Sequence, residues 1–557
     1  MTYREKYENW LKSPVVGDEL KWELDQIRDD DKAIQLRFAK DLEFGTAGLR
    51  GTLGAGSGCM NLVTVGWISA GLARVILSRG EADRGVVIGR DSRLMSKEFA
   101  FHAARVFAAL GVKVYLYDDI RPTAAVSFAV LHFGAAAGVN ITASHNPKQY
   151  NGYKVYGPDG AQLAPDLAEA VVREAGSDML APVSLCDFDE AVSLGCIQVI
   201  GEELDRLYLE RIEASAVEKA EPCPDFHMVY TPFYGSGYRL VPQVLRDGKK
   251  NFSICAEQSQ PNGNFPTADP PNPERLEAFA LALEQAKKEK AQLVLGTDPD
   301  ADRLGVLVLH DGEYRMLTGN QIGVLLCDYI LSTRKAAGTL PKDGFVVKSI
   351  VSTNLAQAVC EEYGIELINV LTGFKYIGQQ IDLLEDKGGR TFLFGFEESY
   401  GYLGASYARD KDAVYASMMV SDMALHYHHQ GLDLIDVLER IYQKHGYYGE
   451  RTIGLSLDPL TGMQALREKM RGLLENPPEQ LAGLRVERAV DFSKGYEKLP
   501  PADIVALDLE GGTRVYIRPS GTEPKVKLYV MARAGSQEEL NEQIQALSPA
   551  VQALVEL

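Results

Sequence analysis

The stretch GVVIGRDSRLMSKEFAFHAARVFAALGVKVYLY, residues 85–117, gives the strongest indication of the fold class of this chain. It opens with a short apolar strand at 85–89 and passes through the polar turn 91–93 into a helical pattern of apolar residues. Gly111 ends that pattern, and a second apolar strand follows at 112–117. Strand, polar turn, helix, glycine and strand form the order of a βαβ unit, which predicts a parallel or mixed sheet.

The same order occurs twice more along the chain. A strand at 227–230 leads through glycines into a helical pattern, and a strand at 345–347 leads through a Ser/Thr turn into another. After Gly364 the chain resumes as a strand at 365–368. Because the three units lie a domain length apart, on the order of 110 to 140 residues, the sequence predicts three related α/β domains.

The two ends of the chain differ from this plan. Residues 1–40 mix charged and apolar positions and predict helices ahead of the first sheet. Strands at 514–518 and 526–532 flank a turn rich in Pro, Ser and Gly, and a helix is expected from about residue 537. We therefore expect a smaller C-terminal α+β domain, and we place the four domains at 1–208, 209–318, 319–447 and 448–557.

Composition narrows the class of protein. The 557 residues exceed what one core can hold, and 46% hydrophobic with 24% charged residues is ordinary for a globular protein. A net charge of −19 argues against a nucleic-acid or anionic-membrane partner but permits a small anionic ligand in a local basic pocket. Seven scattered cysteines lack zinc spacing, and no signal peptide or membrane span is evident. These features predict a cytoplasmic location.

A serine in a polar turn is the first candidate for chemistry. The heptapeptide NITASHN at 140–146, followed by Pro147, comes directly after the apolar stretch 135–139. Ser144 in that turn could be a nucleophile or a phosphate carrier. An ordinary strand-to-loop turn is the commoner outcome for an isolated Ser-His pair.

Three alternating aspartates indicate what kind of chemistry that serine could perform. Asp298, Asp300 and Asp302 follow the apolar strand 293–296, at the end of a strand where ligand sites of α/β proteins gather. Alternate residues project to one side, and carboxylates crowded together repel unless a cation joins them. All-oxygen ligation favours Mg²⁺, Mn²⁺ or Ca²⁺ over zinc, and the string lacks the glycine and glutamate of a calcium-binding hand. A serine with a hard-cation site indicates phosphoryl transfer.

Three further strings are weaker on their own. Residues 518–524, RPSGTEP, offer a guanidinium and a backbone nest to a phosphate but equally suit a hairpin turn. Paired glutamates in 395–401 could accept hydrogen bonds from sugar hydroxyls, although an exposed acidic turn is the simpler interpretation. The glycine-rich loop 44–51 fits neither the dinucleotide nor the P-loop spacing. The histidines within 426–429 favour a helix surface and receive no role.

Together these strings resemble the α-D-phosphohexomutase superfamily, in the branch of the bacterial α-phosphoglucomutases and phosphoglucomutase/phosphopentomutase enzymes. The motifs occur in the family's order across nearly the whole chain: the glycine-rich loop, the phosphoserine loop, the metal loop, the sugar loop and the phosphate loop. The resemblance implies an α/β fold of four domains around a central cleft, made of three related mixed α/β domains and a smaller C-terminal α+β domain. One departure is Phe396 directly before Glu397, where many members have glycine.

The resemblance also implies roles for particular residues. Ser144 would carry the phosphoryl group, Lys154 would be a general acid or base, and Arg50, His145 and Arg303 would assist them. One Mg²⁺ per chain would be held by Ser144, Asp298, Asp300 and Asp302. The expected substrate-binding residues are Thr372, Gly373, Lys375, Glu397, Ser399, Lys411, Arg518, Ser520, Gly521, Thr522 and Lys527.

The implied reaction interconverts α-D-glucose 1-phosphate and glucose 6-phosphate through a phosphoserine and a glucose 1,6-bisphosphate intermediate. A hinge is expected, with the C-terminal domain as the moving part, because one clamp must accept either phosphate. Phosphopentomutase and phosphomannomutase remain open as alternatives, as does the oligomeric state. A metal-dependent phosphatase and a non-catalytic phosphosugar sensor are the rival classes.

Overall fold

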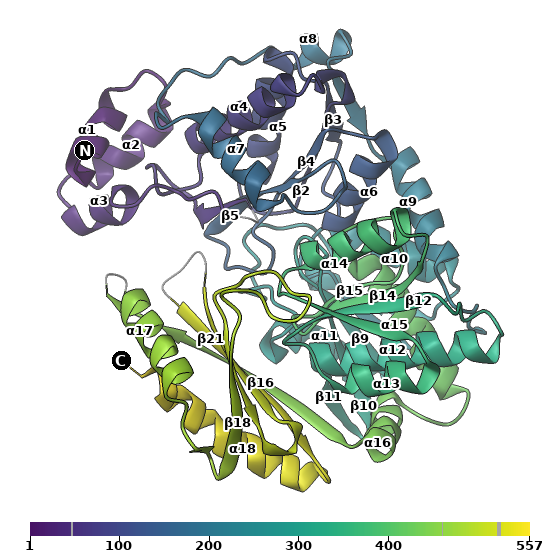
Figure 1. Cartoon of the computed structure of the whole chain (residues 1–557). Helices are drawn as coiled ribbons and strands as arrows, with labels where there is room; N and C mark the ends of the chain where they lie inside the picture. Colours follow the sequence, from purple (N-terminus) through teal and green to yellow (C-terminus); the bar gives the residue numbers. More distant parts are fainter. Residues whose placement is uncertain (46–47, 459–460, 521–524, 557) are drawn as a thin grey trace. The chain divides into compact units, whose positions relative to one another are not determined.

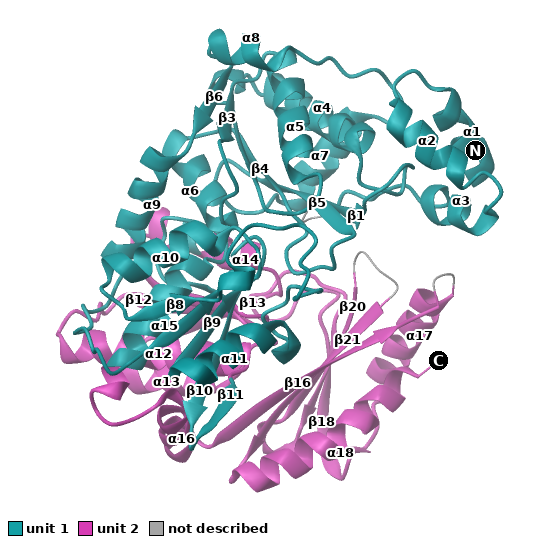
Figure 2. Cartoon of the chain, turned by 180° about the vertical axis from the view of Figure 1, so that it is seen from behind, with its two compact units in different colours: residues 1–316, 381–383, 401–425 teal, residues 317–380, 384–400, 426–557 magenta. Residues whose placement is uncertain are grey.

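Four β-sheets with flanking helices build the chain, which the computed structural model describes at residues 1–45, 48–458, 461–520 and 525–556 (Figure 1). The chain divides into two units (Figure 2). Unit 1 comprises residues 1–316, 381–383 and 401–425, and unit 2 comprises 317–380, 384–400 and 426–557. Within the described ranges, none of the helices has the length and apolar character that a membrane crossing needs.

The first sheet of unit 1 has six strands in the order β1-β5-β4-β2-β3-β6. β2, β3, β4 and β6 run parallel, while β5 pairs antiparallel with β4 and β1. The strands are β1 (Leu49–Thr52), β2 (Val86–Arg90), β3 (Val114–Tyr117), β4 (Ala137–Ile141), β5 (Tyr150–Tyr156) and β6 (Ile197–Ile200). The βαβ unit predicted from residues 85–117 is therefore confirmed as β2, α5 and β3.

Helices cover both faces of this sheet. Val86 and Ile88 of β2 join one core with α4 and α5, whereas Gly89 on the opposite face lies against Val126 of α6. The helices of this part are α1 (Tyr3–Lys12), α2 (Asp18–Gln26), α3 (Asp31–Phe38), α4 (Leu62–Ser78), α5 (Ser96–Ala109), α6 (Thr123–Phe133), α7 (Pro165–Ala175), α8 (Phe188–Ser193) and α9 (Glu202–Ala214), with the short turn η1 (Ala82–Arg84). As predicted, α1 to α3 precede the first sheet, and they share a separate small core.

The second sheet of unit 1 has the order β11-β10-β9-β7-β8. β7 pairs parallel with β8 and β9, and β10 adds an antiparallel hairpin with β11. Its elements are β7 (Met228–Thr231), α10 (Gly237–Asp247), β8 (Phe252–Ile254), η2 (Ala256–Gln258), η3 (Leu276–Phe279), α11 (Ala280–Glu289), β9 (Leu293–Thr297), β10 (Leu304–His310) and β11 (Glu313–Met316). β15 (Gly401–Leu403) and most of α15 (Ala413–His428) also belong to unit 1.

Unit 2 begins with the parallel strands β13, β12 and β14. Its elements are α12 (Gly319–Ala336), β12 (Gly344–Ser349), α13 (Leu355–Tyr363), β13 (Glu366–Val370), α14 (Phe374–Ile381, its last residue in unit 1), η4 (Asp382–Asp386, shared between the units), β14 (Thr391–Glu397) and α16 (Leu434–His445). This is the third predicted strand–helix–strand unit, with the strand expected at 365–368 confirmed as β13.

The C-terminal part of unit 2 is an antiparallel six-stranded sheet, β16-β21-β20-β19-β18-β17. Its elements are β16 (Tyr447–Ser456), α17 (Gly462–Glu475), β17 (Gln480–Leu481), β18 (Leu484–Asp491), β19 (Val505–Leu509), η5 (Glu510–Gly512), β20 (Arg514–Pro519), β21 (Lys525–Ala534) and α18 (Gln537–Val555). One face packs on α17 and α18, and the other packs on Ile350, Val351 and Leu371 beyond the ends of β12 and β13. The predicted α+β domain is confirmed.

Candidate active site

Ser144 lies in the loop directly after β4, which is buried along its whole length. Its backbone has φ 52°, a left-handed conformation that is uncommon for a residue with a side chain. The backbone N–H donates to Thr142 Oγ1 at 2.8 Å, and Ser144 Oγ donates to Asp298 Oδ2 at 2.7 Å. The serine hydroxyl thus points directly at the first aspartate of the predicted metal loop.

The three aspartates lie together after β9. Asp298 Oδ1 accepts the backbone N–H groups of Asp302 and Arg303, each at 3.0 Å, which folds the loop back on itself. One carboxylate oxygen from each of Asp298, Asp300 and Asp302 lies within 4.8 Å of the others, and all three side chains are buried. Asp300 Oδ1 and Asp302 Oδ1 have no hydrogen-bond partner among the described residues. Buried, crowded, unsatisfied carboxylate oxygens suit a hard divalent cation such as Mg²⁺.

Two lysines contact the same carboxylates. Lys154 Nζ on β5 lies 2.7 Å from Asp300 Oδ2 and 3.1 Å from Asp302 Oδ2, and Lys411 Nζ lies 3.1 Å from Asp302 Oδ2. Burial alone would lower the pKa of Lys154, but Asp300 and Asp302 raise it above its usual value. Burial and the neighbouring carboxylates raise the pKa of Asp298, whereas Lys154 and Lys411 outweigh burial and lower that of Asp302. Asp300 and Asp302 therefore favour the charged form of Lys154.

Three further expected residues surround this group in unit 1. His145 Nδ1 lies 3.1 Å from Ser144 Oγ, and burial, reinforced by Arg303 and Arg50, lowers its pKa well below the usual value. The guanidinium of Arg303 pairs with Glu274. Arg50 on β1 lies 3.5 Å from Asn146 Oδ1 in the serine loop. The imidazole next to the hydroxyl is thus neutral at pH 7.

The expected sugar-side residues lie in unit 2, at the ends of β13 and β14. The buried carboxylate of Glu397 accepts the backbone N–H of Gly373 at 2.7 Å. Thr372 Oγ1 is buried and, within the described ranges, has no hydrogen-bond partner. Lys375 lies over the ring of Tyr376, and burial lowers its pKa. Ser399 follows β14 and is partly buried. These groups can meet hydroxyl and phosphate oxygens.

The expected phosphate clamp begins at the end of β20. Arg518 Nη1 donates to Tyr529 Oη at 3.3 Å, and Lys527 lies directly opposite Arg518 on β21. The backbone N–H of Ser520 donates to Lys525 O at 2.8 Å. Gly521 and Thr522, the other two predicted clamp residues, lie outside the described residues. Two cations side by side at a strand end can bind an anion.

Two residues without a predicted role contact this machinery. Thr123, the first residue of α6, donates its hydroxyl to Asp300 Oδ2 at 2.9 Å and its backbone N–H to Asp300 O at 2.8 Å. Arg93, in the turn after β2, binds backbone carbonyls of the serine loop. Each follows a parallel strand of the first sheet, and that position at the carboxyl end was the signal that could have identified them.

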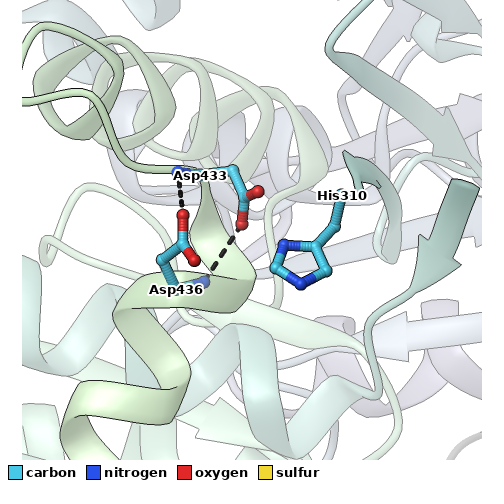
Figure 3. A group of neighbouring side chains, drawn as sticks. All are labelled: His310, Asp433 and Asp436. Carbon is cyan, nitrogen blue, oxygen red and sulfur yellow. Dashed lines mark hydrogen bonds between the residues drawn. The ribbon is translucent and has the colours of Figure 1, made fainter. Parts of the chain in front are cut away.

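A second acidic group has a structural explanation. Figure 3 shows Asp433 and Asp436 at the start of α16, where each side chain accepts the other residue's backbone N–H, at 3.0 Å in both directions. This reciprocal pair is a capping box of the helix. His310, also drawn there, ends β10 in unit 1, and we assign it to no site.

Four family models match consecutive parts of the chain. They describe the alpha/beta/alpha domains I, II and III and the C-terminal domain of phosphoglucomutase/phosphomannomutase, at residues 41–180, 206–312, 318–445 and 469–549. The chain belongs to the phosphoglucomutase/phosphomannomutase family. This confirms the resemblance to the phosphohexomutases and the expectation of three α/β domains with a C-terminal domain.

Individual relatives agree with the family. A phosphoglucomutase of Staphylococcus aureus is 35% identical over 526 residues, which cover 92% of this chain and 93% of the relative. The open form of parafusin, a phosphoglucomutase from Paramecium, has a TM-score of 0.69 at 16% identity and covers 92% of this chain and 95% of its own. An Aspergillus fumigatus N-acetylphosphoglucosamine mutase, solved with glucose 1,6-bisphosphate, has a TM-score of 0.52 at 14% identity, covering 93% and 96%. The two structures show the shared fold.

Proposed function

We propose that this chain is a phosphoglucomutase that interconverts α-D-glucose 1-phosphate and glucose 6-phosphate. The observation that carries the proposal is the hydroxyl of Ser144, 2.7 Å from Asp298 in a cluster of three buried aspartates. The phosphoglucomutase relative at 35% identity supports glucose as the sugar. The reaction is an isomerisation, because a phosphate ester is lost at one oxygen of the sugar and a phosphate ester is formed at another oxygen of the same sugar.

In the proposed reaction Ser144 carries a phosphoryl group. A free sugar hydroxyl attacks that phosphorus, the bond from phosphorus to Ser144 Oγ breaks, and a sugar bisphosphate results. After the bisphosphate turns round, Ser144 Oγ attacks the other phosphorus, the bond from that phosphorus to the sugar oxygen breaks, and the remaining sugar monophosphate is the product. Glucose 1,6-bisphosphate would be the intermediate, and the fungal relative solved with that compound supports this choice.

The buried aspartates fit one Mg²⁺ per chain. Asp298, Asp300 and Asp302, with a phosphate oxygen on Ser144, would hold it, since two of their oxygens lack hydrogen-bond partners within the part of the chain that is described. When bound, such an ion neutralises the charge of a transferring phosphoryl group. The chain's own residues position the serine and fix the aspartates before substrate arrives.

We propose roles for the other expected site residues from their positions in the structure. Lys154 would give or take the proton of the reacting hydroxyl, with Arg50, His145 and Arg303 around the serine. Lys411, which contacts Asp302 in unit 1, would meet substrate beside the metal loop. In unit 2 the sugar-side and clamp residues would hold the hydroxyls and the distant phosphate: Thr372, Gly373, Lys375, Glu397, Ser399, Arg518, Ser520, Gly521, Thr522 and Lys527. We also propose domain limits near 208, 318 and 447 and a central cleft.

A cytoplasmic enzyme acting on a small phosphosugar fits the remaining features. All seven cysteines are free, and the net charge of −19 is unfavourable for nucleic acid. We propose no partner beyond the phosphosugar.

The test is a coupled assay for glucose 6-phosphate with the Ser144→Ala variant. We expect turnover to fall at least about 10³-fold, because without the hydroxyl the phosphoryl group has no carrier. Ser193→Ala, which removes an exposed serine from α8 of the same unit, is the matched control and should retain turnover. Near-normal turnover in Ser144→Ala would exclude Ser144 as the carrier.

Assays of the wild-type protein with other substrates test the rival activities. We expect glucose 1-phosphate to have a higher kcat/KM than mannose or ribose 1-phosphate, with little free phosphate released. A preference for ribose or mannose 1-phosphate would reassign the sugar. Free phosphate produced in place of the isomer would indicate a phosphatase.

A further inference from the structure

The guanidinium of Arg93 is buried under the loop that carries Ser144. The residue is 3% exposed and follows β2 in the turn that precedes α5. Its Nη2 donates to the backbone carbonyls of Ser144 and Asn146. Its Nη1 donates to the carbonyls of Pro147 at 3.0 Å and Tyr150 at 3.1 Å. One side chain therefore binds four carbonyl groups along the segment from Ser144 to the start of β5.

That segment needs such a support. Ser144 adopts φ 52°, and a non-glycine residue in this region persists when surrounding contacts enforce it. The carbonyl groups of Ser144 and Asn146 lie outside the strands and require donors from elsewhere. A guanidinium has five N–H donors in a planar fork, whereas an ammonium has three donors at a single point. Only arginine can reach four carbonyls from a single fixed plane.

Arg93 is itself held by its surroundings. Its Nε lies 3.3 Å from Asp91 Oδ2, and the other oxygen of Asp91 accepts the backbone N–H of Arg93 at 2.9 Å and the hydroxyl of Ser96 at 2.8 Å. The guanidinium also lies 5.1 Å from the ring centre of Phe265, in the segment between β8 and β9. The fork is thus fixed by β2 and α5 on one side and by the part of unit 1 that carries the aspartates on the other.

We propose that Arg93 is a positioning residue of the phosphoryl transfer, which holds the backbone of the Ser144 loop in the conformation that aims Oγ at the aspartates. It would act through the loop, because its hydrogen bonds and ion pair among the described residues include none of the carboxylates of Asp298, Asp300 and Asp302. This inference rests on the proposed function, because it gives Arg93 its purpose through Ser144.

The test compares Arg93→Lys with Arg84→Lys in the full chain with Mg²⁺ present. Arg84 is a matched control: it also donates to backbone carbonyls, of Gly134 at 2.8 Å and Ala135 at 3.3 Å, but it precedes β2 at the strand's other end. For Arg93→Lys we expect kcat to fall about 100-fold, as a displacement near 1 Å of a reacting group can cause. The KM for glucose 1-phosphate should stay within about threefold, and Arg84→Lys should keep wild-type kcat.

A second variant addresses folding. In Arg93→Ala, millimolar guanidinium chloride should raise kcat at least about tenfold. The same concentration of sodium chloride should leave kcat unchanged. Restoration requires a folded protein with a loop that lacks only its donors. The proposal is overturned if Arg93→Lys keeps kcat within threefold of wild type. It is also overturned if kcat falls only in proportion to lost folded protein, without rescue.

The two proposals fail separately. If Ser144→Ala is inactive and Arg93→Lys has a normal kcat, the proposed mutase function stands and Arg93 has no part in its mechanism. Full activity in Ser144→Ala would remove the carrier itself, whatever Arg93 does.

Discussion

Thr123 connects a metal-loop carboxylate to the first sheet. Its hydroxyl accepts a hydrogen bond from Asn140 Nδ2 at 2.9 Å and donates to Asp300 Oδ2 at 2.9 Å. Asn140 lies in β4, only a few residues before Ser144. These two hydrogen bonds therefore connect β4, the strand before Ser144, to the aspartate cluster, which lies more than 150 residues further along the sequence. Contacts of this kind orient metal ligands and tune their affinity.

We expect Thr123→Val to weaken Mg²⁺ binding roughly 10-fold. Valine keeps the shape of threonine but removes the donor, so Asp300 Oδ2 loses a partner that holds its orientation. Calorimetric titration with MgCl₂ measures the effect, and Thr123→Ser, which retains a hydroxyl, serves as the control. Equal Mg²⁺ affinity in Thr123→Val and wild type would show that the bridge does not tune the site.

At the scale of elements, a buried polar group links β16 to β12 and α12. Glu450 on β16 accepts a hydrogen bond from Asn320 Nδ2 at 3.1 Å, and Lys348 on β12 donates to Ser352 O at 2.9 Å. Burial raises the pKa of Glu450 to about 7, although Thr353, Asn320 and Lys348 oppose the shift. Burial lowers the pKa of Lys348 to about 7, against the attraction of Glu450 and Glu398. We therefore expect the stability of the junction between the two sheets of unit 2 to depend on pH.

The Glu450→Gln variant tests this junction between pH 5 and 7. The folded state holds the Glu450 proton up to about pH 7 and the unfolded chain only up to about 4.5, so wild-type stability falls as pH rises through this window. Relative to wild type, Glu450→Gln should gain about 2 kcal/mol between pH 5 and 7.

Scanning calorimetry of both proteins at pH 5, 6 and 7 measures the difference. Glu487→Gln on β18, which removes an exposed glutamate, is the control and should follow the wild-type pH profile. Parallel pH profiles for Glu450→Gln and wild type would contradict the raised pKa.

The packing of these elements also bears on the expected hinge. The C-terminal sheet shares a buried apolar cluster with Ile350, Val351 and Leu371, and Tyr516, Tyr529 and Met531 face them. Burial raises the pKa of Tyr376 and Arg518 opposes part of that rise, so the clamp arginine lies within electrostatic reach of α14. A hinge of the C-terminal domain would have to open this cluster, and it stays a prediction.

At the scale of the whole molecule, the acidic cluster should make thermal stability depend on Mg²⁺. Binding to the folded state alone stabilises it by about 2.7 kcal/mol at a concentration 100 times the Kd. For a chain of this size we expect Tm to rise by about 2–4 °C when MgCl₂ is added to protein treated with EDTA.

Asp298→Asn is the comparison for that measurement, because it removes one ligand charge and keeps the side-chain shape. Its Tm should respond to MgCl₂ by less than about 1 °C at the same concentration. A Tm of wild type that is unaffected by MgCl₂ would argue that the aspartates hold no ion in the resting protein.

Local patterns along the chain were enough to predict the individual helices and strands and the residue types available for chemistry. Apolar runs bounded by glycines at 85–117 predicted β2, α5 and β3, since hydrophobic periodicity acts over a few residues. The order of the serine, aspartate, glutamate and arginine strings predicted the family. The strand expected at 112–117 begins instead at Val114 in the structure, because residues in a turn and in a strand end share the same apolar pattern.

The contacts between side chains of different loops became known from the packing of the sheets. Asp298 lies 2.7 Å from Ser144, Lys154 bridges Asp300 and Asp302, and Arg93 and Thr123 support the two loops from strands that precede them. These contacts join residues far apart in the sequence, and those of Asp298, Asp300 and Asp302 with Ser144, Lys154 and Thr123 join the two sheets of unit 1. Spacing along a chain fixes what each loop can contribute, whereas distances between atoms far apart in the sequence are set by the packing of the sheets.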